Sequence, residues 1–295
     1  MPKVTIIVNR RAGTVLRLGE EQVRRVLARG LAAERRDTEI RLVDPGELLH
    51  ALEAAFASDC EVVGLGGGDG TLRSAAPLAM HSGKSLAILP LGTLNLLSKD
   101  LGVPQALEAA ARLIPHGRVR QIDVGEVNEE YFLVKAMIGR INATVRAREK
   151  TRSRFNPLTW AKVLWHAARA VFRVRKRRFR IAFDGTEELH HTAMLTVAVN
   201  RLTGRLGNPF FRARLDGGKL AVYRFPEMSS ETLLAHLDSE SPVLDSFLLG
   251  EAKGLTVSTR RPRLYASLDG ELVFLKTPLR FTLHAHALSV IGSPS

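Results

Sequence analysis

A run of glycines around one acidic residue is the feature of this sequence best suited to chemistry. The sequence GGGDGT occupies residues 66–71, directly after the apolar run 60–65 and before a helical pattern at 71–80. Glycines let backbone N–H groups approach a phosphate closely, and the N-terminus of the following helix adds positive potential. Asp69 could orient a Mg²⁺ ion or a hydroxyl group. The segment therefore predicts a phosphate-binding turn, and the alternative is a tight turn that only closes a βα unit.

A second turn of this kind follows one strand and one helix later. The sequence LPLGTLN at residues 89–95 ends a predicted strand at 86–89 and leads into a predicted helix at 94–101. In a parallel sheet both turns lie at the carboxyl edge of the strands, where ligands bind. Thr93 and Asn95 could bond a nucleotide there, although Thr93 is also an ordinary helix-capping residue.

Two better-known phosphate loops are excluded by single positions. Residues 83–85 (GKS) resemble the end of a Walker A loop, but the first glycine of that motif would fall at Leu78. The dinucleotide-binding pattern GxGxxG fails in every frame, because Asp69, Thr71 or Arg73 occupies its last glycine position. Neither motif is present.

The elements that must position these turns divide the chain at about residue 120. Before it, apolar strands alternate with helices over short connections, which predicts a parallel α/β sheet. The expected strands are 3–9, 39–43, 60–65 and 86–89, and the expected helices are 19–34, 46–57, 71–80, 94–101 and 104–115.

The second part of the chain is rich in β-type segments separated by Asp-Gly turns, which predicts an antiparallel β-domain. One long helix at about 157–177 interrupts it. The expected strands are 121–127, 131–138, 178–184, 192–199, 219–224, 254–258, 263–268, 271–275 and 279–291.

Positive charge is concentrated in one segment of the chain. Residues 146–180 hold thirteen Arg and Lys residues against Glu149 alone, which is +12 of the chain's net charge of +13. Such asymmetry indicates a polyanionic partner, either nucleic acid or anionic lipid.

Cys60 is the single cysteine, so no intramolecular disulfide is possible and a reducing cytoplasm fits. No apolar stretch reaches the length of a membrane-spanning helix, and the N-terminal apolar run is too short for a signal peptide.

The predicted helix at 157–177 is amphipathic. Its apolar positions recur at helical spacing, with Trp and Phe widening the apolar side and Lys and Arg lying off it. This pattern suits an anionic membrane interface, which we favour over nucleic acid because no known nucleic-acid module surrounds it. The alternative is a helix packed on its own domain with a solvated basic face.

Taken together, the motifs resemble the diacylglycerol kinase catalytic-domain family, which includes bacterial lipid kinases and the sphingosine and ceramide kinases. The resemblance follows the loop 9–13, GGGDGT at 66–71, LPLGTLNLLSKDLG at 89–102 and SLDGE at 267–271. It covers nearly the whole chain and is weakest over 145–215. GGDGT is shared with NAD kinases and phosphofructokinases, whereas the longer run and the late DGE are more specific to lipid kinases.

The resemblance implies a phosphofructokinase-like N-terminal α/β domain at 1–120 and a mainly antiparallel β-sandwich domain at 121–295, with ATP in the cleft between them. Its catalytic carboxylates would be Asp269 and Glu271, with Asp69 organising the phosphate and Mg²⁺ region. The residues it assigns to the nucleotide are Asn9, Arg10, Arg11, Ala12, Gly13, Gly66, Gly67, Gly68, Asp69, Gly70, Thr71, Leu72, Gly92, Thr93 and Asn95.

The chemistry of phosphoryl transfer agrees with these assignments. The reaction needs Mg²⁺ to neutralise charge and a carboxylate to take the acceptor's proton, and an Asp-Gly-Glu turn holds two acids close together. The alternative for residues 269–271 is an ordinary hairpin turn. Asp216 matches the structural Mg²⁺ site of some bacterial members, and here too the alternative is an ordinary Asp-Gly turn.

Three positions depart from the family pattern. The first motif is usually Asn-Pro-x-Ser-Gly, whereas residues 9–13 read NRRAG, so a hydroxyl is absent and two arginines are added. No threonine follows the second strand at Val43-Asp44, and Leu96 stands where the family often has Asp after Asn95. An altered kinase is therefore a competing interpretation.

These features predict an ATP- and Mg²⁺-dependent lipid kinase that phosphorylates a diacylglycerol or sphingoid-type hydroxyl. We expect it in the cytoplasm, peripherally bound to the inner face of the membrane, without a nucleic-acid partner. The alternatives are an NAD kinase-like enzyme and a degenerate kinase that acts as a membrane- or nucleotide-binding regulator.

Overall fold

The chain folds into two compact units, seen here in a computed structural model. The structure describes residues 4–31, 38–139, 177–183, 185–203, 211–225 and 243–293. Unit 1 comprises residues 1–124 and 285–295, and unit 2 comprises residues 125–284. The predicted basic helix at 157–177 falls outside the described residues except for Arg177, which begins a strand.

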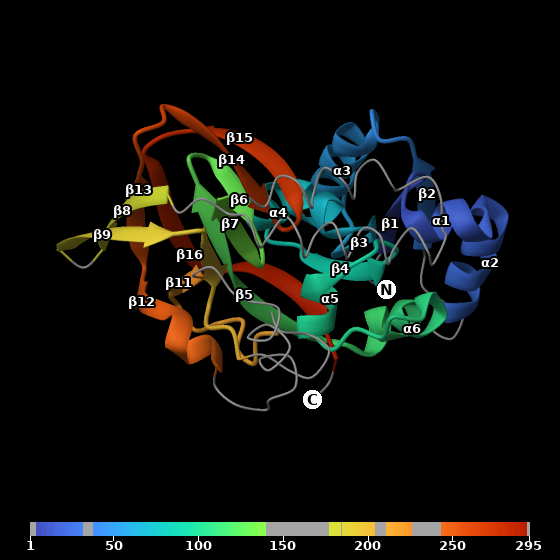
Figure 1. The fold of residues 1–295 in the computed structure, drawn as a ribbon. Helices are drawn as coiled ribbons and strands as arrows, with labels where there is room; N and C mark the ends of the chain where they lie inside the picture. Colours follow the sequence, from blue (N-terminus) through green and yellow to red (C-terminus); the bar gives the residue numbers. More distant parts are fainter. Residues whose placement is uncertain are drawn as a thin grey trace. The chain divides into compact units, whose positions relative to one another are not determined.

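Unit 1 is built on a parallel sheet with the strand order β2-β1-β3-β4-β16 (Figure 1). The central strands are almost wholly buried because helices cover them. Its strands are β1 (Val4–Asn9), β2 (Thr38–Val43), β3 (Val62–Gly67), β4 (Ser85–Pro90) and the end of β16 (Leu279–Gly292). Its helices are α1 (Gly13–Leu18), α2 (Glu20–Leu31), α3 (Leu48–Ala57), α4 (Asp69–Ser82), α5 (Leu96–Asp100) and α6 (Leu107–His116).

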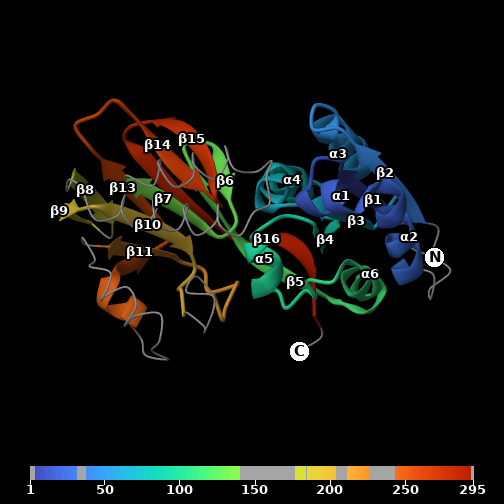
Figure 2. The same ribbon diagram turned by 45° about the vertical axis from the view of Figure 1, so that its right-hand side comes forward.

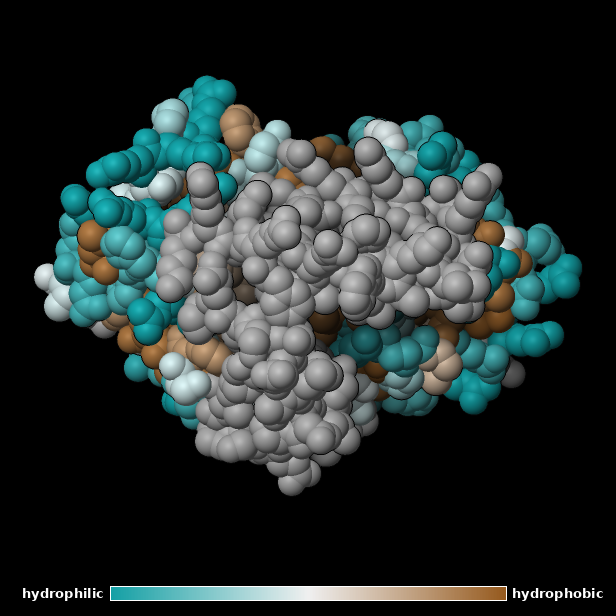
Figure 3. Space-filling model, in the orientation of Figure 1, coloured by the Kyte–Doolittle hydropathy of each residue, from teal (hydrophilic) through white to brown (hydrophobic). Residues whose placement is uncertain are grey.

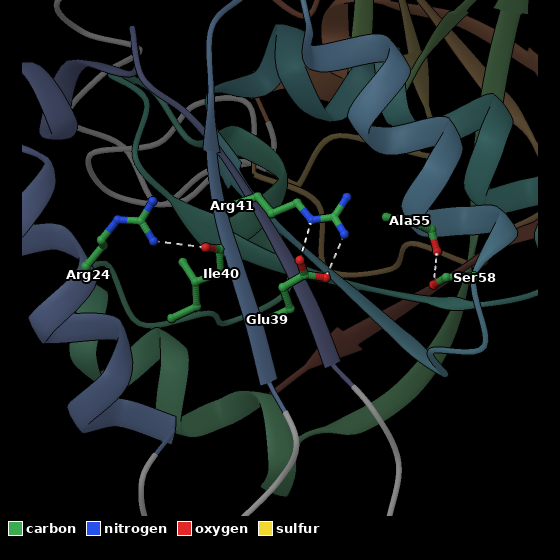
Figure 4. A network of polar contacts seen from close by, with 6 residues as sticks. All are labelled: Arg24, Glu39, Ile40, Arg41, Ala55 and Ser58. Carbon is green, nitrogen blue, oxygen red and sulfur yellow. Dashed lines mark hydrogen bonds and ion pairs between the residues drawn. The ribbon is translucent and has the colours of Figure 1, made fainter.

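Small residues and polar contacts attach the helices of unit 1 to each other and to the sheet. A Cβ on Gly30 would lie 2.6 Å from the Cβ of Ala111, so only glycine allows α2 to approach α6 this closely. Arg24 of α2 donates to the carbonyl of Ile40 in β2 at 2.9 Å (Figure 4). These contacts fix the outer strand against α2.

Unit 2 consists of two antiparallel sheets. One has the order β16-β13-β8-β9, and the other has the order β12-β11-β10-β7-β14-β15 (Figure 2). The strands are the end of β5 (Arg118–Val127), whose residues 118–124 belong to unit 1, and β6 (Glu130–Phe132), β7 (Lys135–Gly139), β8 (Arg177–Phe183), β9 (Thr186–Thr192), β10 (Met194–Val199), β11 (Leu220–Phe225), β12 (Leu248–Ala252), β13 (Gly254–Ser258), β14 (Arg263–Leu268) and β15 (Glu271–Lys276), with the 3₁₀ helix η2 (Val243–Phe247).

The inner faces of both sheets of unit 2 contribute to one hydrophobic core. Phe179 and Phe281 come from the first sheet, and Leu195, Val222 and Leu268 come from the second. Alternate residues of each strand therefore point inward, as in a β-sandwich. The predicted fold class, a mixed α/β part followed by an antiparallel β part, is confirmed.

The structure corrects several predicted elements. The C-terminal segment 285–295 belongs to unit 1, because Val290 and Ile291 of β16 pair in parallel with β4. The sequence pattern missed α1, β9 and β12, because short or polar elements have weak periodicity. The predicted strand 131–138 is interrupted between Phe132 and Lys135, where the N–H groups of Leu133 and Val134 donate to a side chain.

Candidate functional site

Three loops of unit 1 meet at the carboxyl edge of its parallel sheet. They follow β1, β3 and β4, and the backbone of Leu91 joins them. The Leu91 N–H donates to the Gly67 carbonyl at 3.1 Å, and the Leu91 carbonyl accepts from the Thr14 N–H at 3.1 Å. The predicted phosphate turn at 66–71 and the turn at 89–95 therefore lie side by side, as parallel topology requires.

Glycine is a steric requirement where the two turns touch. A Cβ on Gly92 would lie 2.4 Å from the Cα of Gly68 and 3.3 Å from its nitrogen. Because the obstructing atoms are backbone, they could not yield as a flexible side chain would. The absence of side chains here leaves the backbone groups of the turn open to a ligand, which is the geometry that phosphate cradles use.

Asp69 links the first turn to the second. It begins α4, and its Oδ1 accepts the N–H of Leu96 at 2.8 Å, at the start of α5. One carboxylate oxygen thus satisfies a helix N-terminal N–H that has no intrahelical partner. Asp69 therefore holds the two loops together in addition to any role toward a metal ion.

Asn95 and Thr93 have different surroundings. Asn95 is buried in the left-handed conformation with φ 51°, and its Nδ2 donates to the Gly92 carbonyl at 3.2 Å and to Gln105 Oε1 at 3.3 Å. Its Oδ1 is buried and accepts no hydrogen bond within the described part of the chain. Thr93 is exposed. Asn95 shapes the loop and offers an unused acceptor, whereas the Thr93 hydroxyl faces solvent.

The loop after β1 separates its two arginines. Asn9 Oδ1 accepts the Arg11 N–H at 2.9 Å, which closes the turn. Arg10 forms ion pairs with Asp44 at 3.0 Å and with Glu20 at 3.2 Å. The hydrogen bond to Asp44 and the charge of Glu20 raise the pKa of Arg10 above its ordinary value. The charge of Arg10 is therefore balanced by acidic partners, whereas the Arg11 side chain is exposed.

In unit 2, Asp269 has both carboxylate oxygens occupied by backbone donors. Oδ2 accepts the N–H of Leu133 at 2.6 Å, and Oδ1 accepts those of Val134 and Lys135, both at 2.9 Å. The residue is 3% exposed. Burial raises the pKa of Asp269, while the three N–H donors and the charge of Arg212 oppose the rise. Asp269 therefore anchors the segment 133–135, and this contact explains the break between β6 and β7.

Arg212 completes the network around this segment, and sequence reasoning missed it. The residue is 1% exposed, and its Nη1 donates to the carbonyls of Leu133 at 2.8 Å and Val199 at 3.0 Å. In the segment 133–135, three N–H groups thus donate to the Asp269 carboxylate, and the Leu133 carbonyl accepts from the Arg212 guanidinium. No sequence pattern could have identified Arg212, because it lies in a stretch without regular structure.

Glu271 is close to Asp269 in sequence but differs from it in environment. Residues 269–270 form the two-residue turn of the β14–β15 hairpin, with φ of 49° and 95° and with Leu268 paired to Glu271. Positive φ at both positions is the geometry of a type I′ turn, which favours Asp-Gly. The hairpin turn is therefore present, and it leaves Glu271 exposed while burying Asp269.

Asp216 was predicted as a metal ligand. Its Oδ1 lies 3.5 Å from Nε of Arg214, so a cation from the chain itself accompanies the carboxylate. Within the described ranges no cluster of three or more His, Cys, Asp or Glu side chains occurs. The role of Asp216 stays a prediction.

The fold of the chain is similar to that of a solved diacylglycerol kinase. A diacylglycerol kinase structure from Bacillus anthracis superimposes with a TM-score of 0.73 over 99% of this chain and 97% of that chain, at 23% identity. At this identity the likeness establishes the fold alone.

Sequence comparison then gives a family match over the N-terminal segment. Residues 3–127 match the family model of the diacylglycerol kinase catalytic domain, and the resemblance read from the motifs is confirmed. The chain is similar to "Probable lipid kinase YegS-like" of Pseudomonas aeruginosa, at 40% identity over 124 residues. That match covers 41% of this chain and 40% of the relative. A "Diacylglycerol kinase" of Mycobacterium tuberculosis is 28% identical over 83% of this chain and 77% of its own length.

Proposed function

We propose that the protein is an ATP- and Mg²⁺-dependent kinase that transfers the γ-phosphate of ATP to a lipid hydroxyl at a membrane surface. The observation that carries the proposal is the meeting of Gly68 and Gly92 in a segment that matches the diacylglycerol kinase catalytic domain. The close approach of these glycines supports a phosphate-binding role, since it exposes backbone groups that a side chain would cover.

Several residues around the glycines would bind the nucleotide. The loops 9–13, 66–72 and 92–95 would line it, and the buried Asn95 Oδ1 would accept a hydrogen bond from the base or the ribose. Arg11 would contact the phosphates, because it is exposed while Arg10 is paired with acids. This offers a physical substitute for the hydroxyl that Ala12 lacks.

Metal and proton roles would fall to the acidic residues. Asp69 fits a Mg²⁺ site because it is a carboxylate beside an open glycine turn, and a bound Mg²⁺ would neutralise phosphate charge. Of the two carboxylates in the DGE turn, we assign Glu271 to the acceptor's proton, because it is exposed whereas both oxygens of Asp269 accept backbone N–H groups. Asp269 would act as a positioning residue, and Asp216 would hold a structural Mg²⁺.

The proposed acceptor is a lipid alcohol with its head group at an anionic membrane. None of the helices in the described parts of the chain is long and apolar enough to cross a bilayer. We place the enzyme on the inner face of the cytoplasmic membrane, with the basic segment 146–180 as one source of attraction to anionic lipid.

The test is a transfer assay with radiolabelled ATP and Mg²⁺ against a panel of lipid alcohols in anionic micelles, with NAD as a further acceptor. We expect label in a lipid phosphate and its loss in Asp69→Ala, with the variant still unfolding cooperatively. Label in NADP would instead support an NAD kinase. Stabilisation of the protein by ATP without any transfer would support a degenerate kinase that acts as a regulator.

A further inference from the structure

The outer side of the β14–β15 hairpin combines exposed aromatic rings with unpaired cations. Tyr265 and Phe274 are 39% and 51% exposed, and they are the two aromatic residues among the exposed large hydrophobic side chains of the described chain. They lie directly opposite each other across the hairpin, with ring centroids 4.6 Å apart. Elsewhere the visible described surface is mainly hydrophilic with small separate hydrophobic spots (Figure 3).

Strand alternation places two cations on the same side as the rings. Arg263 lies opposite Lys276, one pair beyond Tyr265 and Phe274 toward the open end of the hairpin. The Arg263 guanidinium carbon is 5.9 Å from the centre of the Phe274 ring. The intervening residues Leu264 and Leu275 are buried in the core of unit 2, so the two faces of the hairpin are clearly distinguished.

Two further cations lie next to the open end of the hairpin, just before β14. Arg260 and Arg261 are exposed, and the carbonyl of Pro262 accepts the N–H of Thr277 at 2.9 Å, which closes that end. Residues 259–268 and 272–281 contain no acidic residue. In the described part of the molecule none of these four cations forms an ion pair. We call the set the docking face, and its members are Arg260, Arg261, Arg263, Tyr265, Phe274 and Lys276.

We propose that the docking face binds an anionic lipid bilayer. Exposed aromatic rings place an apolar body at the level of the head groups, and long basic side chains beside them attract anionic lipid. β15 is the edge strand of its sheet within the described part of the chain (Figure 1), and Tyr265 and Phe274 are both exposed. The absence of acids in residues 259–268 and 272–281 matches the negative charge of the bilayer, and no member of the docking face belongs to the basic segment 146–180 of the sequence.

The face also suits single-stranded nucleic acid in part, since bases stack on aromatic rings. The observations favour a bilayer, because the two rings lie against each other as one small apolar platform, whereas single-stranded nucleic acid is bound by a groove with successive stacking positions. This inference rests on the proposed function, which is phosphorylation of a lipid at a membrane surface. Vesicle binding needs neither ATP nor turnover, however, so the two proposals can fail separately.

The experiment measures co-sedimentation of the full chain with vesicles of phosphatidylglycerol and phosphatidylcholine, and with vesicles of phosphatidylcholine alone, at low and high salt. The aromatic variant carries Tyr265→Thr and Phe274→Thr, because threonine keeps β-propensity. The charge variant replaces the four cations of the docking face with Gln. A matched control replaces four exposed cations elsewhere with Gln, namely Arg17, Arg29, Arg118 and Lys253.

We expect the charge variant to bind anionic vesicles about tenfold or more weakly than the matched control, with a smaller salt dependence. The aromatic variant should lose binding that persists at high salt, because burial of the rings is not screened. If the double variant unfolds at a lower temperature than the parent, the single variant Phe274→Thr is used in its place. The proposal is overturned if both variants bind vesicles as well as the control does. It is also overturned if the variants lose binding to a single-stranded oligonucleotide but keep their binding to vesicles. Transfer to a short-chain soluble acceptor, measured in parallel, reports on the kinase proposal alone.

Discussion

At the scale of single residues, the two acids of the Asp-Gly-Glu turn have been separated by folding. Asp269 is buried with three backbone N–H donors, and Arg212 binds the other side of the same backbone segment. Glu271, two positions later, is exposed at the first position of β15. A carboxylate whose oxygens are occupied stabilises its donors, whereas an exposed carboxylate can take a proton. We therefore expect substitutions at the two acids to have different effects.

Asp269→Asn should lower the free energy of unfolding by about 1–3 kcal/mol, because an amide NH₂ would face a buried N–H donor. Glu271→Gln should change stability by less than about 0.5 kcal/mol. If Glu271 takes the proton, its variant should still lower turnover about 10²–10⁴-fold. Urea denaturation and the lipid transfer assay measure the two quantities. An Asp269→Asn variant as stable as the parent would contradict the anchoring role.

At the scale of elements, the candidate site depends on how closely two strand-to-helix turns approach. Gly68 begins the connection from β3 to α4, and Gly92 lies between β4 and α5. Their backbones meet without side chains between them, and Asp69 ties α5 to the first turn through the Leu96 N–H. The elements themselves are ordinary βα units, and the site arises from their contact.

Gly92→Ala should disturb this contact, because its Cβ would lie 2.4 Å from the Cα of Gly68. We expect a loss of about 1–3 kcal/mol of stability, as for other overpacked sites, together with a smaller rise in melting temperature on addition of ATP and Mg²⁺. Gly46→Ala is the matched control, because Gly46 lies outside the proposed nucleotide loops. A Cβ on Gly46 would have no heavy atom within 4 Å. Equal thermal shifts in both variants would argue against a nucleotide at this contact.

At the scale of the whole molecule, a buried tyrosine makes stability depend on pH in alkaline solution. Tyr223 is fully buried, and its hydroxyl accepts the N–H of Leu202 at 2.8 Å. Burial raises the pKa of Tyr223 to about 12 from an ordinary value of 10.0. The folded protein therefore keeps a proton that the unfolded chain loses. The stabilisation is fully present below pH 10 and is lost as the pH rises toward 12.

Between pH 10 and 12, the free energy of unfolding should fall by about 2–3 kcal/mol less in Tyr223→Phe than in the parent, since one pKa unit corresponds to about 1.4 kcal/mol. The chain has three tyrosines, so the absorbance of tyrosinate can be followed directly. Tyr223 should titrate late, and this late titration should be absent in the variant. A parent protein without a late-titrating tyrosine would contradict the burial effect.

The sequence by itself determined the local features of this protein. The bounds of β14 follow from alternation over residues 263–268, and the Asp-Gly turn after it follows from the positive φ that both positions require. The glycine turn after β3 was also visible, because the change from an apolar strand to a helical pattern is local. Each of these signals arises from residues within a few positions of one another.

Only the tertiary structure decided which groups meet. Asp269 bonds a backbone segment 134 to 136 positions away, and that contact breaks the strand that alternation had predicted at 131–138. Arg212 joins the same segment from a stretch without regular structure, and the end of β16 returns to the sheet of unit 1. Long-range hydrogen bonds depend on which distant segments become neighbours in the folded chain. Hydrophobic periodicity is a local pattern and does not indicate this. Burial, not residue type, therefore made Asp269 an anchor and left Glu271 exposed to solvent.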